Sequence, residues 1–156
     1  MSSEDIRLIE DCRDEIRKIE NWINSNPVDS NIKYLVAYAV VKSSGTIEIV
    51  FKKIIHSFLA EGSKIEVQKY LEKSIIDSPA NPKTGMMEKY IEQFDPVRKE
   101  MFNSMLKKSQ EKVDLNSLVS LRNDIAHGRD ISTTIATVNK YFESGIKVLN
   151  RLEEVL

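Results

Sequence analysis

Residues 118–128 of the 156-residue chain read LVSLRNDIAHG, and their pattern predicts the end of a helix. Apolar side chains recur there at helical intervals, and Gly128 follows where a helix commonly ends on a glycine. Asp114 is of a type that often caps helix N-termini, so we expect this helix to cover residues 115–127. Its expected packing residues are Leu115, Leu118, Val119, Leu121, Ile125 and Ala126.

Longer segments on either side carry the same helical pattern. Isoleucines at helical intervals predict an amphipathic helix over residues 4–24, and a broader apolar pattern predicts a second helix over residues 31–60. Ser132 or Thr133 is expected to cap a final helix. The buried stripe of that helix is Ile135, Val138, Phe142, Ile146, Leu149, Leu152 and Leu156.

Glycine and proline mark the breaks between helices. NPVDSN at 26–31 and DSPANPKTG at 77–85 predict loops, whereas the lone Gly45 is expected to allow close helix packing. Asp95 followed by Pro96 is typical of a helix start. Three shorter helices are therefore predicted over residues 64–76, 86–94 and 95–108. No segment competes as a strand, so the predicted fold class is all-α, a bundle of about five or six helices.

Composition indicates one domain, residues 1–156, with an amphipathic helix over 1–26 and a core bundle over 31–156. With Lys+Arg 23 and Asp+Glu 24, the chain lacks the strongly basic surface of proteins that coat nucleic acid. The single cysteine, Cys12, excludes an intrachain disulfide. The most apolar run, YLVAYAVV, is too short to span a bilayer, so we expect a cytoplasmic protein with no membrane contact.

The polar residues at the end of the 115–127 helix are the clearest candidates for chemistry. Asn123 and His127 are four residues apart and share a helix face, and Arg122 lies beside Asn123. Two structural interpretations compete: His127 could complement the helix dipole, and Arg122 could pair with a carboxylate. Spacing alone does not choose between these and a functional site.

The whole string, in an all-α chain, resembles the HEPN family, and its RN…AHG wording looks most like the RiboL-PSP-HEPN branch. The family signature is an arginine followed by a polar residue, with a histidine four to six residues after the arginine. Many active members are metal-independent endoribonucleases that work as dimers with their signature helices facing one another. The resemblance therefore implies a HEPN-like bundle with Arg122, Asn123 and His127 in an RNA-cleavage site and no metal or other cofactor.

The implied roles agree with the chemistry of these side chains. Histidine can act as a general base or acid near neutral pH, and arginine offers a rigid fork to phosphate oxygens. Asn123 would position the imidazole or a substrate oxygen. Because one histidine cannot easily be base and acid at once, a second copy of His127 in a homodimer is expected. RNA, the second copy and an antitoxin or regulatory protein are the expected partners of a toxin or antiphage effector.

Glu48 is a candidate supporting residue, because the family often carries an acidic residue on this long helix near the site. It would orient Arg122 or His127. The alternative is an ion pair with Lys52, one helical turn away.

Asp124 and Arg129 are the remaining candidates for substrate binding. Arg129 occupies the place where HEPN proteins paired with nucleotidyltransferase antitoxins often have a tyrosine, so that partnership is not expected. Five basic residues could line an RNA path or form a solvated face with Glu100 and Glu111. They are Arg98, Lys99, Lys107, Lys108 and Lys112.

Two other functions remain open. The chain could be a catalytically inactive HEPN module that binds RNA, a nucleotide or a protein partner. It could also be a helical interaction protein in which the motif arose by chance.

Overall fold

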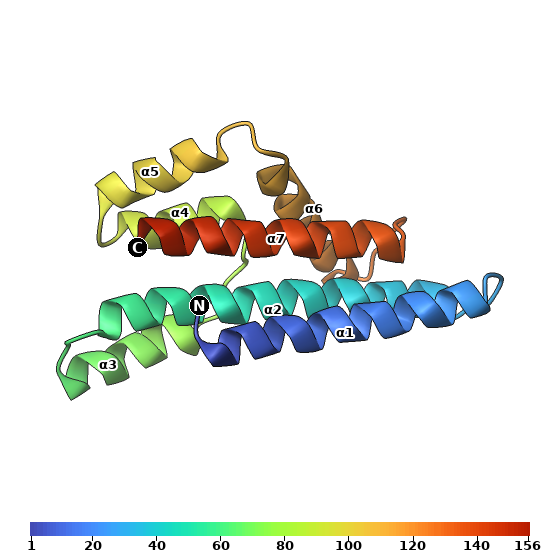
Figure 1. The fold of residues 1–156 in the computed structure, drawn as a ribbon, viewed down its shortest axis with the longest axis horizontal. Coiled ribbons are helices and arrows are strands. Elements are labelled where there is room, and N and C mark those ends of the chain that lie inside the picture. Colours follow the sequence, from blue (N-terminus) through green and yellow to red (C-terminus); the bar gives the residue numbers. More distant parts are fainter.

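The structure, a computed structural model, describes residues 1–156 and contains helices but no strand, which confirms the predicted all-α bundle. Seven α-helices and one π-helical segment, η1, are present, where about five or six helices were predicted (Figure 1). They are α1 (Ser3–Ser25), α2 (Ile32–Ala60), α3 (Ile65–Leu71), η1 (Glu72–Ile76), α4 (Thr84–Glu92), α5 (Pro96–Leu106), α6 (Gln110–Ala126) and α7 (Ile135–Val155).

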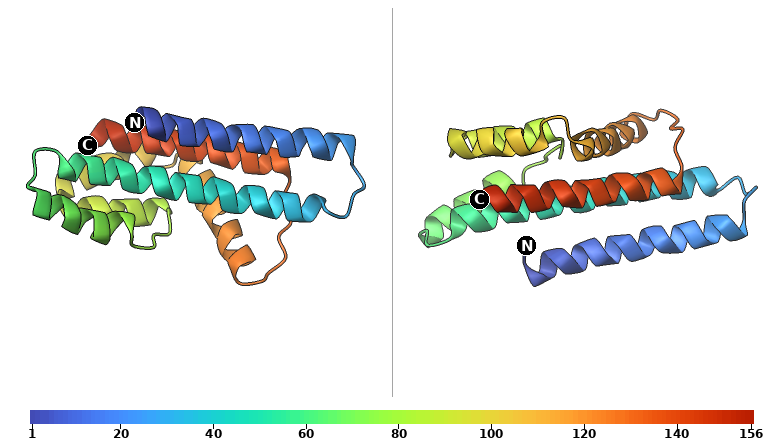
Figure 2. Two further views of the ribbon diagram at one scale, coloured as in Figure 1. Left: turned by 90° about the horizontal axis from the view of Figure 1, so that it is seen from below. Right: turned by 45° about the horizontal axis from the view of Figure 1, so that its top comes forward.

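The three longest helices, α1, α2 and α7, contact one another and form the body of the bundle (Figures 1 and 2). On one side of this body α6 packs across α7 and α2, and α5 also contacts α7. The short helices α3 and η1 pack on α2, while α4 contacts α5 and α6. The loop over 77–83 therefore joins two separate sides of the bundle.

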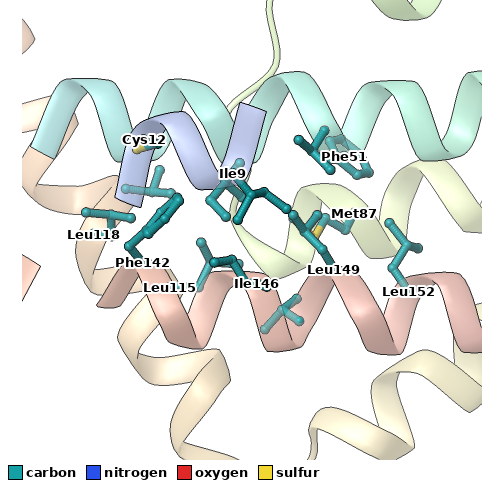
Figure 3. Close-up of a cluster of buried hydrophobic side chains, with 14 of the residues drawn as sticks. Ile9, Cys12, Phe51, Met87, Leu115, Leu118, Phe142, Ile146, Leu149 and Leu152 are labelled. Atoms are coloured by element: carbon teal, nitrogen blue, oxygen red, sulfur yellow. The ribbon is translucent and has the colours of Figure 1, made fainter. Parts of the chain in front are cut away.

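One continuous hydrophobic core holds these helices together. Figure 3 shows side chains from α1, α2, α4, α6 and α7 meeting in it, among them Cys12, Phe51, Met87, Leu118 and Phe142. The predicted stripe of α7 is buried from Ile135 to Leu152, because its apolar residues recur at helical intervals.

An ion pair joins α1 to α7 at the edge of this core. Arg13 donates two hydrogen bonds to Glu143, Nε to Oε1 at 2.6 Å and Nη2 to Oε2 at 2.8 Å. This bidentate contact with Glu143, together with Glu10, raises the pKa of the Arg13 guanidinium further above its ordinary value. The N-terminal helix is thus held by charge as well as by its isoleucines.

The close helix approach occurs at a different glycine from the one predicted. A Cβ atom on Gly45 would have no atom within 4 Å, so the expectation of close packing there is wrong. A Cβ atom on Gly145 in α7 would lie 2.9 Å from Cδ1 of Ile47 and 3.4 Å from Cδ1 of Leu115. Gly145 therefore lets α7 approach α2 and α6 at once.

Asp114 does not cap α6, as the sequence had suggested, but lies inside it. The helix begins one turn earlier, where Ser109 Oγ accepts a hydrogen bond from the backbone N–H of Lys112. The carboxylate of Asp114 is only 2% exposed and accepts a hydrogen bond from Ser144 Oγ on α7. Its function as a tertiary contact could not be read from a local capping pattern.

The other helix starts largely follow their local sequence. Asp95 caps α5 as predicted, accepting from the first backbone N–H groups of the helix. Thr134, rather than Ser132 or Thr133, caps α7, with Oγ1 accepting from the N–H of Thr137 at 3.2 Å.

By length and composition alone, α2 meets the criteria of a membrane-spanning helix, with a mean hydropathy of 1.3 over its most apolar 18 residues. This is longer than the eight-residue run considered from the sequence. Half of that stretch is buried inside the bundle, where Val40, Ile47 and Phe51 have no exposed surface. A core helix meets the same criteria, and α2 packs as one.

Candidate functional site

The predicted signature lies at the C-terminal end of α6. Ala126 is the last residue of the helix, and His127 follows as its cap. Gly128 has a φ of 69°, in the left-handed region that glycine tolerates, and the N–H of Arg129 returns to the carbonyl of Asp124 at 2.9 Å. The predicted glycine stop is thereby confirmed. In the left view of Figure 2 this end of α6 projects away from the three long helices.

Arg122 differs from every other arginine of the chain. Each of the other six has a carboxylate oxygen within 4 Å, whereas Arg122 has none. Its side chain is half-buried, and its Nη1 donates one long hydrogen bond, 3.4 Å, to Oδ1 of the neighbouring Asn123. The carboxylate pair considered as an alternative from the sequence is therefore absent. A half-buried guanidinium with free donors is suited to an anion.

His127 is exposed and its side chain has no hydrogen-bond partner within the chain. His56, the other histidine, is half-buried in α2 and likewise carries no side-chain hydrogen bond. No group of three histidine, cysteine, aspartate or glutamate side chains is arranged to hold a metal ion. A single chain thus presents one open imidazole at the same helix end as Asn123 and the free guanidinium.

Asp124 and Arg129 contact each other. Arg129 Nη1 lies 2.9 Å from Asp124 Oδ1, and both side chains are exposed enough for solvent to screen the pair. These two candidates therefore border the site as a local ion pair.

Glu48 makes the ion pair with Lys52 that the alternative interpretation predicted, and one further contact. Its Oε1 accepts from Lys52 Nζ at 2.8 Å and from the backbone N–H of Ala80 at 3.0 Å. Lys52 also donates to the carbonyl of Ile76. Both side chains are mostly buried, so the pair fastens the 77–83 loop to α2. No hydrogen bond or ion pair joins Glu48 to Arg122 or His127.

The first part of α6 is fastened to its neighbours by polar side chains. Asn116 Oδ1 accepts from the backbone N–H of Thr84 at 3.0 Å, which caps the start of α4. Asp114 accepts from Ser144 at 2.9 Å and pairs with Lys140. Further contacts to other elements come from Glu111, Lys112 and Ser120. After Ser120, every side-chain hydrogen bond of α6 is local.

Burial and hydrogen bonding act in opposite directions on Asp114. Burial alone would raise the pKa of its carboxyl group, but the donors of Gln110 and Ser144 and the charge of Lys140 outweigh it and lower the pKa. Asp114 is therefore a charged anchor between the helix that carries the site and α7.

Three of the five basic residues considered as an RNA path, Arg98, Lys99 and Lys112, make other contacts within the chain. Arg98 donates to the last carbonyls of α7, those of Val155 and Leu156, and Lys99 pairs with Glu100. Arg98 thus completes the open end of a helix, as cations often do there. Of the five, Lys112 lies nearest in the chain to the site, and it pairs with Glu88.

Two lysines beside α6 were missed from the sequence. Lys83 precedes α4 and donates to Ser120 Oγ at 3.2 Å, and Lys89 lies in α4. Neither has a carboxylate partner within 4 Å. They are more than 30 residues from the signature, so only the packing of α4 on α6 could reveal that they are close to it.

Comparison with known proteins adds one finding to this geometry. The family model described as RiboL-PSP-HEPN matches residues 7–156, which is nearly the whole bundle. No curated protein and no solved structure matches the chain.

Proposed function

Because the chain belongs to the RiboL-PSP-HEPN family, whose superfamily comprises ribonuclease and nucleotide-binding modules, we propose that it is a metal-independent endoribonuclease. In this proposal it acts as a homodimer with a shared RNA-cleavage site formed by Arg122, Asn123 and His127. Unregulated cleavage of RNA would harm the cell. This fits a toxin or antiphage effector held in check by an antitoxin or regulatory protein.

The free guanidinium of Arg122 is the observation that carries the proposal. Six of the seven arginines are used in ion pairs, and the exception is the half-buried arginine of the signature, five residues before an exposed histidine. Arginine presents planar donors that match two phosphate oxygens. A phosphodiester would supply the anion that the chain itself does not provide.

The reaction would proceed by attack of the ribose 2′-oxygen on the adjacent phosphorus. A base removes the 2′-hydroxyl proton, the bond to the 5′-oxygen breaks, and an acid protonates that leaving oxygen. The products are a 2′,3′-cyclic phosphate and a 5′-hydroxyl. His127 would move these protons, Arg122 would stabilise the charge on the phosphoryl oxygens, and Asn123 would position the imidazole or a substrate oxygen.

A second copy of the chain would complete this chemistry. His127 is exposed at the projecting end of α6, so two such ends can approach without unfolding either chain. One imidazole would then serve as base and the other as acid. Two copies of Arg122 would also double the positive charge at the phosphate, which compensates for a chain whose net charge is near zero.

Cleavage of a labelled single-stranded RNA in EDTA tests the proposal. We expect the wild type to cleave, and His127→Ala and Arg122→Ala to lose about 100-fold or more in rate, the typical effect of removing one stabilising or proton-transferring group. His56→Ala is the matched control and should cleave as the wild type does. Equal cleavage by wild type and His127→Ala, or none by either, would contradict the nuclease proposal. The second result would favour a binding module.

A further inference from the structure

Two grooves run side by side along the exposed flank of α6. The first, about 600 Å³, lies over Val113, Ser117 and Leu121, reaches Asp124, and is bordered by Tyr141 of α7. The second, about 480 Å³, lies at the start of α4. Lys83 and Asn116 line both grooves, so the two adjoin and together form a track along α6. Asp124, at one end of the track, directly follows Asn123 in the chain, although the three signature side chains themselves do not line either groove.

The far end of the track carries a net positive charge. Lys83, Lys89 and Lys112 line the second groove, and Glu88 is its one carboxylate. Glu88 is already paired with Lys112 at 3.1 Å, so Lys83 and Lys89 remain without a carboxylate partner. Two ammonium groups without a carboxylate partner in one groove are suited to phosphate groups.

The groove between α1 and α2 has the opposite character. It is lined by Asp11, Asp14 and Glu15 against Lys18 and Lys42, and Lys42 is paired with Glu15 at 2.8 Å. A polyanion would be repelled there. The track along α6, by contrast, has lysines without a carboxylate partner and lies along the helix that carries the signature.

The first groove offers surfaces for bases. Val113 is 56% exposed, and Leu121 and Tyr141 also line this groove. The hydroxyls of Ser117 and Ser120 are interspersed with these apolar groups. Apolar and aromatic side chains support unpaired bases by stacking and contact, and neighbouring hydroxyls can accept or donate hydrogen bonds.

The wall between the two grooves is held in place by hydrogen bonds. Asn116 Oδ1 accepts from the backbone N–H of Thr84, and Asn116 Nδ2 donates to Thr84 Oγ1 at 3.3 Å. Thr84 has no exposed surface. Lys83, the cap of α4, and Lys89, in its last turn, therefore belong to a helix whose start is fixed to α6, which lowers the ordering cost of binding.

We propose that this track binds single-stranded RNA beside the scissile phosphate, with Lys83 and Lys89 on its phosphates and the α6 flank against its bases. The inference rests on the proposed nuclease function and extends the same site. Ser120, which holds Lys83, lies seven residues before His127, a rise of about 10 Å along the helix. Lys83 would therefore contact a phosphate beyond the scissile one. Double-stranded RNA would not reach the Tyr141 surface with its bases.

RNA binding by cleavage-deficient protein tests the track. The background is His127→Ala, and the probe is a fluorescent single-stranded RNA of about 12 nucleotides, within the range of known single-strand sites. Adding Lys83→Gln and Lys89→Gln should raise the Kd about tenfold. It should also reduce the slope of log K against log salt by about 1.4, the value for two phosphate contacts on a single strand. A blunt duplex of the same sequence should bind more weakly.

Lys69→Gln with Lys73→Gln is the matched control in the same background. Both lysines are exposed, lie in α3 and η1, and have no carboxylate within 4 Å. Their loss removes the same charge and should leave the Kd unchanged. An equal effect of both pairs would mean that charge matters but not the track.

The outcomes separate this inference from the nuclease proposal. If RNA binds with the same Kd and salt slope with and without Lys83 and Lys89, or does not bind at all, the proposal that the track binds RNA is contradicted, even if the wild type cleaves. If binding depends on these lysines but the wild type does not cleave, the track is supported and the nuclease proposal fails.

Discussion

Asp114 and Arg122 are charged residues of the same helix with opposite surroundings. Asp114 is almost fully buried and is surrounded by donors, those of Gln110, Lys140 and Ser144. Arg122 is half-buried and has only its neighbour Asn123. Burying a charge is costly unless it is paired. The bundle pairs the carboxylate of Asp114, whereas the guanidinium of Arg122 remains open to an anionic ligand.

We predict that Asp114→Asn lowers the free energy of unfolding by about 1–2 kcal/mol at neutral pH, because the amide cannot accept from all the donors that the carboxylate satisfies. The folded pKa of Asp114 lies below its ordinary value of 3.8. The contribution of the charge is therefore complete above about pH 5 and is lost as the pH falls through the folded pKa. Urea unfolding of wild type and variant between about pH 2.5 and 7 measures it.

The difference between wild type and Asp114→Asn should shrink only in the acidic part of that range. Asp77→Asn is the control, since Asp77 is exposed in the loop after η1 and makes no ion pair. A difference that stayed constant down to the lowest pH would show that the charge of Asp114 contributes nothing.

At the scale of helices, local patterns predicted the existence of the elements better than their contacts. Isoleucine spacing and a Gly128 stop are properties of one segment, and the helices they predicted are present. The predicted start of α6 was wrong because Asp114 does not cap the helix but accepts a hydrogen bond from Ser144 on α7. Gly45 was misassigned for the same reason, since the sequence does not show which glycine faces a neighbouring helix.

Replacement of the two helical glycines by alanine should give opposite results. Gly45→Ala adds a methyl group in open space and should raise the free energy of unfolding by about 0.5–1 kcal/mol through helix propensity. Gly145→Ala places the same group against Ile47 and should leave the protein about 1–2 kcal/mol less stable than Gly45→Ala. Thermal or urea unfolding of the pair measures this. Equal stabilities would mean that α7 can move aside without cost.

For the molecule as a whole, the candidate site comes from one short segment, whereas the surface around it is formed by the packing of distant segments. Arg122, Asn123 and His127 could be predicted together because they lie within six consecutive residues at one helix end and match the signature that the chain resembles. Lys83 and Lys89 could not, because a loop fastened by Glu48 and a cap from Asn116 bring them to α6. Tertiary packing therefore extends a short motif into a surface large enough for a polymer.

Subunit mixing tests the shared site at this scale. If base and acid are His127 residues of two chains, a mixed dimer of wild type and His127→Ala has one histidine and should be inactive. Equal amounts after subunit exchange should then give about one quarter of the activity of the same total amount of wild type. The comparison is with wild type mixed with His56→Ala, which should remain fully active. An activity near one half would mean that each chain works alone.

The anchors of α6 are unevenly distributed, and this affects the dynamics of the helix. Every side-chain hydrogen bond or ion pair from α6 to another element starts at or before Ser120, and the signature lies after it. Local opening should therefore cost least at the signature end, with amide protection decreasing from Asp114 toward Gly128. Bound RNA or a second chain would order this last turn, so the conformational entropy lost in the signature would offset part of the binding free energy.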